Sequence, residues 1–492
     1  MGIITRQSIS NTVITYAGIG LGFVLTIFLY PHILSPDQYG LTRVLISAAF
    51  IGSQFAHLGM HHAVVRYFPF FSSREGGKSL FLIWAVVIPL FGFTLFTLLF
   101  LLMQEQILNF YADRSSFFLE YHLWILPLTF FILYFEVLNS YLRSQRDAVT
   151  GSLYNEVILR IAAILAVTLY FLEWISFSTF IAMFVLSYLL QPVAVLMRIL
   201  SLGALRIRPD FSLMRKKLRL GMAKYSFFSL LGGLTTVLVW NIDILMLGSM
   251  AGLEWTAVYA IAFYMGSVIT VPQRAIEKIA APVLAEMIQK KKWMEVDNLY
   301  KKTALNQLLP GFLLFGVIWI LSDLFYLMMP EIYAAGKWVL LIIGIGKLIE
   351  MGTGANGIIL INSKHYRVSF YTNMILVFVT IGANYLLIPQ YGIEGAAIAS
   401  ALALLVYNAV KYLYIRLRMQ LSPFSKEFWI ALFLGSVAFT VASLINPADQ
   451  LILNLLLKGV LFLSLFLVPA VRLSLSADFN RQLSQLLSSF RR

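Results

Sequence analysis

Lysine and arginine lie almost entirely on one side of the apolar stretches in this sequence. We count about fourteen stretches of roughly 20 apolar residues, the length that crosses a bilayer as a helix. Roughly 31 of the 37 Lys and Arg residues fall in loops on the side of the N-terminus, and only Arg114 and Lys337 fall in loops on the other side. Because Lys and Arg are retained on the cytoplasmic side of a membrane, the pattern predicts about fourteen transmembrane helices with both termini in the cytoplasm.

The composition excludes a soluble protein. The 492 residues are 60% hydrophobic and 12% charged, with a mean hydropathy of +0.83, a balance that no soluble domain tolerates. The predicted fold class is therefore an all-α polytopic membrane protein of the bacterial inner membrane. Loops beside anionic headgroups explain the net charge of +14 better than nucleic acid does. The chain has no Cys, which excludes disulfides and thiolate metal sites, and we predict no cofactor and no metal.

A weak internal repeat predicts how the helices are organised. Residues 35–47 (SPDQYGLTRVLIS) align with 252–264 (GLEWTAVYAIAFY), and residues 144–158 align with 363–376 at nearly the same offset. Such a repeat predicts two pseudo-symmetric six-helix lobes with a substrate site between them. The predicted domains are an N-terminal lobe at 1–200, a basic cytoplasmic linker at 201–224, a C-terminal lobe at 225–418, helices 13 and 14 at 419–474 and an amphipathic cytoplasmic tail at 475–492.

Charged residues inside the predicted spans are the best candidates for function. Each costs about 2.5–3.5 kcal/mol at the centre of a bilayer, so each must pair with another charge or face water in a cavity. The candidates are Arg43, Glu136, Glu156, Arg160, Asp243, Lys347 and Glu350. Glu156 and Arg160 are four residues apart, and Lys347 and Glu350 are three apart, so both pairs can form ion pairs on their own helices. The alternative is that these residues line a cavity and also bind substrate.

Arg43 and Asp243 have no partner at helical spacing. Both lie about 7 Å inside the outer end of their spans, from a rise of 1.5 Å per residue, and they belong to different predicted lobes. We predict an ion pair across an outer gate, against the alternative that each side chain reaches the outer interface alone.

Two further groups of polar residues lie toward the cytoplasmic ends of their spans. Glu136, Asn139 and Arg143 share one face of the fourth span, a stripe that we interpret as cavity lining. His57, His61 and His62 lie near Arg66 at the inner end of the second span. We weigh a cationic rim for an anionic headgroup against plain interfacial residues, and metal binding is disfavoured because no acidic residue is near in sequence.

The sequence contains no complete match to the enzyme motifs that we considered. Residues 75–79 (EGGKS) contain Gly-Lys-Ser, but Ser72 stands where a phosphate-binding loop needs its first Gly. No nucleophile elbow or zinc helix motif is present, and we predict that the chain is not an enzyme.

Several segments resemble a known family. Five segments are similar to segments of bacterial polysaccharide flippases. They are FLYPHILSPDQYGLTRVLIS, FAHLGMHHAVVRYFP, WNIDILMLGSMAGLEWTAVYAIA, AAPVLAEM and IPQYGIEGAAIASALALLVYNAVKY. These flippases belong to the multidrug/oligosaccharidyl-lipid/polysaccharide exporter superfamily. The resemblance covers most of residues 1–418.

The resemblance implies two six-helix lobes in a V that alternate access. The implied substrate is an undecaprenyl-diphosphate-linked oligosaccharide, such as an O-antigen, capsule or exopolysaccharide repeat unit, moved from the inner to the outer leaflet. The polysaccharide polymerase machinery is an expected partner. Asp243 occupies the position of an acidic residue typical of the seventh helix in the family. The predicted substrate-binding or cavity residues are Arg43, Arg66, Glu136, Arg143, Arg160 and Lys347, and the predicted gate or ion-coupling residues are Asp243 and Glu350.

Two other functions stay open at this point. A multidrug or cation antiporter of the same superfamily should have a cavity rich in acidic and aromatic residues. A membrane-embedded polymerase or acyltransferase is disfavoured, because polymerases usually need a sizeable outer loop and the longest one expected here, 103–117, is about 15 residues.

Overall fold

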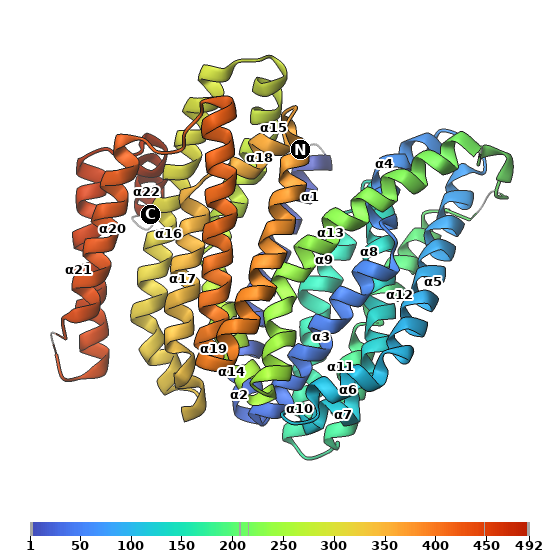
Figure 1. The fold of residues 1–492 in the computed structure, drawn as a ribbon, viewed down its shortest axis with the longest axis horizontal. Coiled ribbons are helices and arrows are strands. Elements are labelled where there is room, and N and C mark those ends of the chain that lie inside the picture. Colours follow the sequence, from blue (N-terminus) through green and yellow to red (C-terminus); the bar gives the residue numbers. More distant parts are fainter. Residues whose placement is uncertain (1–2, 206–207, 215, 447, 490–492) are drawn as a thin grey trace. The chain divides into compact units, whose positions relative to one another are not determined.

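The computed structural model describes residues 3–205, 208–214, 216–446 and 448–489, and these form helices joined by short loops (Figure 1). The predicted all-α fold is confirmed, since the described residues contain no strand. Their contacts divide the chain into two compact units, Met1–Ala257 and Val258–Arg492, called unit 1 and unit 2 below.

Unit 1 is built on helices α3, α5, α8 and α13, with α4 continuing α3 beyond a bend. Large aromatic side chains fill its core, among them Phe71, Phe81 and Tyr141, all fully buried. Its elements are α1 (Ile3–Phe23), the π-helix η1 (Val24–Leu29), α2 (Tyr30–Ile33), α3 (Pro36–Ala56), α4 (Met60–Ser72), α5 (Gly77–Leu102), α6 (Gln104–Tyr111), α7 (Ser116–Tyr121), η2 (His122–Trp124), α8 (Ile125–Ser144), α9 (Val149–Leu153), the π-helix η3 (Tyr154–Ile158), α10 (Leu159–Phe171), α11 (Phe177–Ser187), α12 (Leu190–Ser201), η4 (Phe211–Leu213), α13 (Lys216–Met250) and the start of α14 (Leu253–Val268).

Unit 2 contains the rest of the chain, and its core includes Phe312, Phe315, Phe462 and Phe466. Its elements after α14 are α15 (Val271–Gln289), α16 (Trp293–Leu327), η5 (Glu331–Ala335), α17 (Gly336–Gly352), α18 (Asn356–Asn362), α19 (Tyr366–Met419), α20 (Lys426–Leu444), α21 (Leu451–Arg472) and α22 (Ala477–Ser489).

The number of spans agrees with the sequence. Eleven described helices are long and apolar enough to cross a membrane, and the bent pairs 36–72 and 253–289 raise the number to thirteen. The 54-residue helix α19 is interrupted at Gly392, whose φ of 56° and ψ of −128° are not helical. An unbroken helix of that length would measure about 80 Å, more than twice the thickness of a bilayer core. Counted as two spans, α19 brings the described part of the chain to the predicted fourteen.

The sequence around Ser35 explains where α3 begins. The Ser35 side chain accepts a hydrogen bond from Gln38 N at 3.2 Å, and Gln38 Oε1 accepts one from Ser35 N at 3.0 Å. This reciprocal cap, followed by Pro36 in the first turn, satisfies donors that a helix start leaves free. Across from it, Gly40 approaches the Leu253 carbonyl so closely that a Cβ would lie 1.9 Å from the oxygen, so the two segments aligned as repeats meet at their starts.

Two expectations from the sequence differ from the structure. The mixed-charge amphipathic sequence of 277–302 predicts an interfacial helix, but these residues form the end of α15 and the beginning of α16. The apolar run at 338–361 predicts one continuous span, but α17 ends at Gly352 and α18 begins at Asn356.

The predicted domain boundaries stay a prediction. Helix α13, expected to open the second lobe, packs on α3 within unit 1. The expected linker 201–224 includes residues 206, 207 and 215, and the expected tail 475–492 includes residues 490–492; these lie outside the described residues.

Candidate functional site

In unit 2, the break between α17 and α18 is stabilised by the backbone conformation of Gly354 and by contact with α16. Gly354 has a φ of +59°, which favours glycine, and a Cβ there would lie 2.8 Å from Ala304 N on α16. On the next residue, Ala355 N donates a hydrogen bond to Thr303 Oγ1 at 3.2 Å. The close approach of α16 therefore requires a glycine here and ends α17 in the middle of the expected span.

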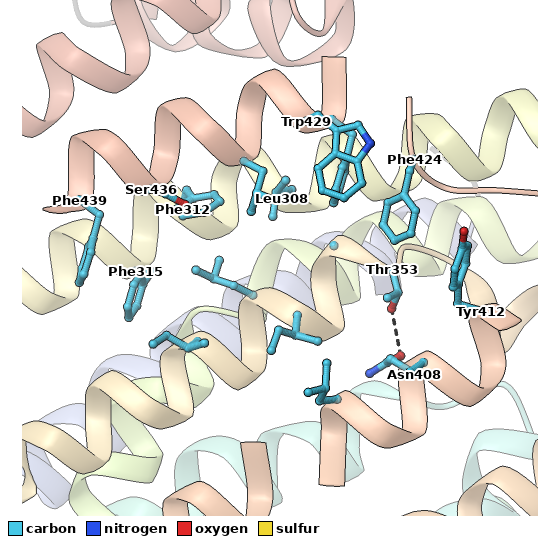
Figure 2. A pocket seen from close by; sticks show the side chains of 18 of the residues that line it. Leu308, Phe312, Phe315, Thr353, Asn408, Tyr412, Phe424, Trp429, Ser436 and Phe439 are labelled. Carbon is cyan, nitrogen blue, oxygen red and sulfur yellow. Dashed lines mark hydrogen bonds between the residues drawn. The ribbon is translucent and has the colours of Figure 1, made fainter. Parts of the chain in front are cut away.

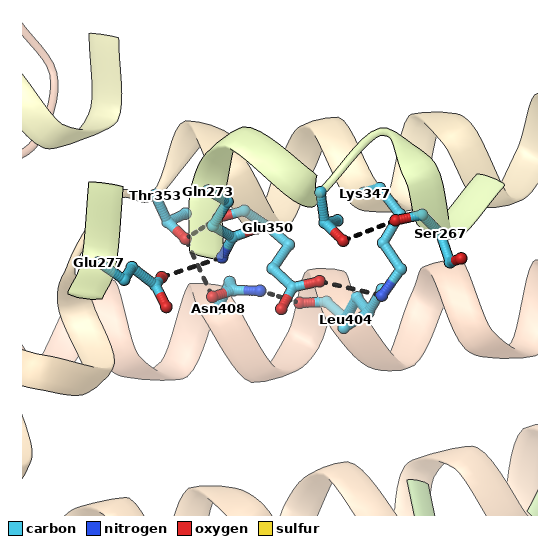
Figure 3. A network of polar contacts seen from close by, with 9 residues as sticks. Ser267, Gln273, Glu277, Lys347, Glu350, Thr353, Leu404 and Asn408 are labelled. Carbon is cyan, nitrogen blue, oxygen red and sulfur yellow. Dashed lines mark hydrogen bonds and ion pairs between the residues drawn. The ribbon is translucent and has the colours of Figure 1, made fainter. Parts of the chain in front are cut away.

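A polar cavity of about 270 Å³ opens beside this break. Residues from α15, α17, α18 and α19 line it. Its lining contains two carboxylates, Glu277 and Glu350, and one ammonium group, that of Lys411 (Figure 3 shows both carboxylates). Discontinuous helices are where ligand sites lie in many transporters, because the freed backbone and side-chain groups need polar partners.

A ladder of hydrogen bonds links the helices around the cavity. Asn408 Oδ1 accepts from Asn356 Nδ2 at 2.9 Å. It also accepts from Thr353 Oγ1 at 2.9 Å, and Asn408 Nδ2 donates to the Leu404 carbonyl at 3.0 Å (Figure 3). Asn408 is 2% exposed. Because a buried amide with satisfied groups resists displacement, this ladder fixes α19 against the break.

The predicted pair Lys347–Glu350 is formed here. Lys347 Nζ lies 3.1 Å from Glu350 Oε2, with the lysine side chain 7% and the glutamate side chain 27% exposed. Glu350 also lines the polar cavity, whereas Lys347 is not one of its lining residues. On α15, Gln273 Nε2 donates to Glu277 Oε1 at 3.0 Å, so both carboxylates have a fixed neighbour.

Two charged residues of this site were missed in the sequence. The sequence predicts that Glu277 lies in the interfacial segment 277–302, although Gln273 four residues earlier puts a second polar side chain on the same face of α15. Lys411 lies near the end of the span that the sequence predicts at 391–415, so it is not among the predicted intramembrane charges. It is 4% exposed, faces Glu350 and Glu277, and donates to the Tyr407 hydroxyl. The spacing of Tyr407, Asn408 and Lys411 was the available signal, because it forms one polar face of a helix.

An apolar cavity of about 650 Å³ lies on the other side of Asn408. Its walls come from α16, α17, α19 and α20, and they carry many aromatic rings, including Phe312, Trp429 and Phe439 (Figure 2). Asn408 lines both cavities. Unit 2 therefore presents a polar pocket and a hydrocarbon-lined pocket that share one wall.

In unit 1 the other predicted ion pair is formed within one helical turn. Arg160 Nη1 lies 2.6 Å from Glu156 Oε2, at the end of the π-helix η3. Asn155 Nδ2 donates to Glu156 Oε1 at 3.0 Å, and Gln191 Nε2 donates to Asn155 Oδ1 at 3.1 Å. A Cβ on Gly18 of α1 would lie 2.8 Å from Arg160 Nη1, so α1 is packed directly against this pair.

Arg43 and Asp243 both belong to unit 1. The Arg43 guanidinium lies over the rings of Tyr39, at 5.0 Å from its centroid, and Tyr30, at 5.5 Å, contacts that stabilise a cation away from water. Asp243 is 3% exposed on α13, which packs against α3. An ion pair between them would hold α13 on α3, and the gate stays a prediction.

The remaining predicted residues lie on α4 and α8. Arg66 is exposed and lies over the Tyr225 ring at 4.4 Å. Arg143 Nη2 donates to Ser140 Oγ at 3.0 Å. Glu136 Oε2 and Asn139 Oδ1 are enclosed and have no hydrogen-bond partner within the described part of the chain. Their role in binding substrate stays a prediction.

Comparison with known proteins identifies the family. The sequence profile of the family described as "Polysaccharide biosynthesis protein" matches residues 4–288, more than half of the chain. No curated protein sequence matches the chain.

Solved structures share its fold at low sequence identity. A lipid II flippase, MurJ in an inward closed conformation, superposes with a TM-score of 0.74 at 15% identity, covering 97% of this chain and 99% of its own. An inward-facing multidrug resistance transporter of the MATE family, in the MOP superfamily, gives a TM-score of 0.63 at 14% identity, with 85% and 98% covered. A Vibrio cholerae MATE transporter, VcmN, gives 0.53 at 14% identity, with 85% and 98% covered. The apolar helices and the shared fold show a multi-pass membrane protein, and the profile match shows that the chain belongs to the polysaccharide biosynthesis protein family.

Proposed function

We propose that the chain moves an undecaprenyl-diphosphate-linked oligosaccharide from the cytoplasmic to the outer leaflet of the bacterial inner membrane by alternating access. In this proposal both termini are cytoplasmic, the chain is not an enzyme, and it works beside the polysaccharide polymerase machinery. The solved structures that share its fold are those of a flippase and of transporters.

The observation that carries the proposal is the pair of cavities in unit 2. A lipid-linked glycan has a hydroxyl-rich head and a long hydrocarbon tail. Amide, hydroxyl and carboxylate groups, as in Asn356, Asn373 and Glu277, are suited to sugar hydroxyls because they donate and accept hydrogen bonds in several directions. The aromatic and aliphatic walls of the neighbouring cavity suit a hydrocarbon chain.

The membrane potential can supply energy for this step. An anion that moves outward across an inside-negative membrane gains about 2.3 kcal/mol per charge per 100 mV. A diphosphate carries at least two charges, so no separate ATPase is needed. The buried and interfacial cations predicted from the sequence, such as Arg66 and Arg160, are the candidates for the diphosphate.

The experiment is complementation of a flippase-deficient strain that makes a defined lipid-linked glycan. Ser436 lines the apolar cavity and is exposed, so Ser436→Phe should fill the cavity without disturbing the core, and Ser436→Ala is the matched control that leaves the volume unchanged. We expect glycan export to be restored by the wild type and by Ser436→Ala and to be reduced at least severalfold by Ser436→Phe at equal protein level. Failure of the wild type with every lipid-linked glycan supplied would reject the function.

A cation antiporter is the second candidate, and one observation favours it. Glu277 and Glu350 both line the polar cavity, and two carboxylates attract a cation. Lys411 opposes this by placing a positive charge in the same lining. Efflux of a cationic dye from vesicles that contain the purified protein, lost in Glu277→Gln, would favour the antiporter.

A further inference from the structure

Unit 1 contains a groove whose lining residues differ from those of the two cavities of the proposed site. It has a volume of about 370 Å³ and lies between the start of α4, the middle of α5 and the first half of α13. Met60 of α4, Trp84 and Ile88 of α5, and Phe227 and Leu230 of α13 form apolar walls. Apart from Ser226 and Arg219, every side chain that lines it is apolar.

The basic residues of α13 are divided between the helix face that lines this groove and the opposite face. Arg219, Ala223, Ser226 and Leu230 line it, and this spacing of three or four residues is one face of a helix. Lys216 precedes Arg219 by three residues and continues this face by one turn. Lys217 and Lys224 are seven residues apart on the opposite face of α13, and all four basic side chains are exposed.

The charge and the shape of the groove together select one class of occupant. Its apolar walls suit a hydrocarbon chain, and none of its lining residues is acidic. Arg219 at its basic end can bind a phosphate in a bidentate manner. A zwitterionic lipid would gain less from the two cations, because its ammonium group cancels the phosphate charge.

We propose that this groove binds an anionic phospholipid, with one acyl chain between α4, α5 and α13 and with the headgroup phosphate on Arg219 and Lys216. The site differs from the general shell of lipid around a membrane protein, because it combines an apolar groove with cations on one helical face.

The test compares two double variants of the full chain that remove equal charge. Lys216→Gln with Arg219→Gln removes the cations on the groove face, and Lys217→Gln with Lys224→Gln removes those on the opposite face. Phosphatidylglycerol and phosphatidylcholine with identical acyl chains are titrated, and bound lipids are counted by native mass spectrometry. We expect the groove-face variant to bind phosphatidylglycerol about fivefold more weakly for each cation removed, which corresponds to about 1 kcal/mol each, and the opposite-face variant to match the wild type.

A second measurement places the acyl chain. Brominated phosphatidylglycerol should quench the fluorescence of Trp84, seen as the difference between the wild type and Trp84→Phe, and Ala223→Phe should reduce that quenching by filling the groove. Equal weakening in the two double variants would overturn the proposal, as general surface attraction would then be the cause. Equal affinity for phosphatidylcholine, or quenching of Trp84 that is unchanged by Ala223→Phe, would also overturn it. None of these readouts depends on glycan transport.

Discussion

Unit 1 and unit 2 each contain an ion pair between residues three or four apart on a membrane-spanning helix, but the surroundings of the two pairs differ. Glu156 and Arg160 in unit 1 contact each other within one helical turn, with Asn155 bonded to Glu156 and with Gly18 of α1 packed against the pair. Lys347 and Glu350 in unit 2 lie where α17 ends, beside a cavity that holds a second carboxylate and a second lysine. The same spacing in the sequence thus leads to a packed contact in one unit and to a polar pocket in the other, and the break at Gly354 makes the difference.

The largest effect that tests this comparison is expected at Lys411. Lys411→Met removes the buried cation that faces Glu277 and Glu350, and loss of one partner from a buried charge group costs about 3–5 kcal/mol. We expect transport to fall at least tenfold and the protein to unfold at a lower temperature, measured by glycan export and by thermal unfolding in detergent.

Two further variants serve as comparisons for Lys411→Met. Lys458→Met removes another buried lysine of unit 2, on α21, that lines neither cavity, and it should leave transport closer to the wild type. Arg160→Met in unit 1 should have a smaller effect on stability, since Glu156 and Arg160 are 26% and 27% exposed and water can replace the lost partner. An equal loss in Lys411→Met and Arg160→Met would mean that the two units do not differ in the way described.

The next effect is expected at the break itself. Gly354→Ala places a side chain at a φ of +59° and 2.8 Å from Ala304 N. The left-handed conformation alone costs about 1–2 kcal/mol, and the backbone contact adds to it. We expect a lower thermal unfolding temperature and reduced transport. Gly382→Ala is the control, because a Cβ there meets nothing within 4 Å, and an equal response of the two variants would contradict the role given to the break.

A smaller effect is expected where α1 meets the ion pair of unit 1. In Gly18→Ala the new Cβ would lie 2.8 Å from the Glu156 carbonyl oxygen and from Arg160 Nη1. Overpacking of this kind costs about 1–3 kcal/mol, part of which α1 can relieve by shifting. Gly20→Ala, two residues away with nothing within 4 Å of its Cβ, should unfold like the wild type. If both variants unfold alike, α1 does not enclose the pair.

The smallest effect concerns a charge outside the spans. Burial alone would raise the pKa of Asp147, but hydrogen bonds from Arg198, at 2.9 Å, and from Thr150 hold that pKa below its usual value of 3.8. A carboxylate whose pKa is lowered by folding stabilises the protein above pH 3.8, and this contribution is lost as the pH falls through the lower folded value. Asp147→Asn should therefore unfold at a slightly lower temperature at neutral pH, and its difference from the wild type should vanish once the pH has fallen below the lowered pKa of Asp147. A difference that persists there would show that packing rather than charge is responsible.

The sequence by itself determined the class, the number of spans and the two ion pairs. A long apolar run must form a helix in a bilayer, since each of its backbone groups must find a hydrogen-bond partner within its own segment. A spacing of three or four residues puts Lys347 beside Glu350 on any helix. These properties are local, so one sequence is enough to read them.

Only the tertiary structure decided which charges share a pocket. Glu277, Glu350 and Lys411 come from α15, α17 and α19, far apart in the chain, and they meet because α17 stops at a glycine that α16 approaches closely. Neither hydropathy nor residue spacing predicts the close approach of α16 to Gly354, because it depends on how one helix packs against another. The same limit applies to Asn408, whose place between a polar and an apolar cavity is set by four helices at once.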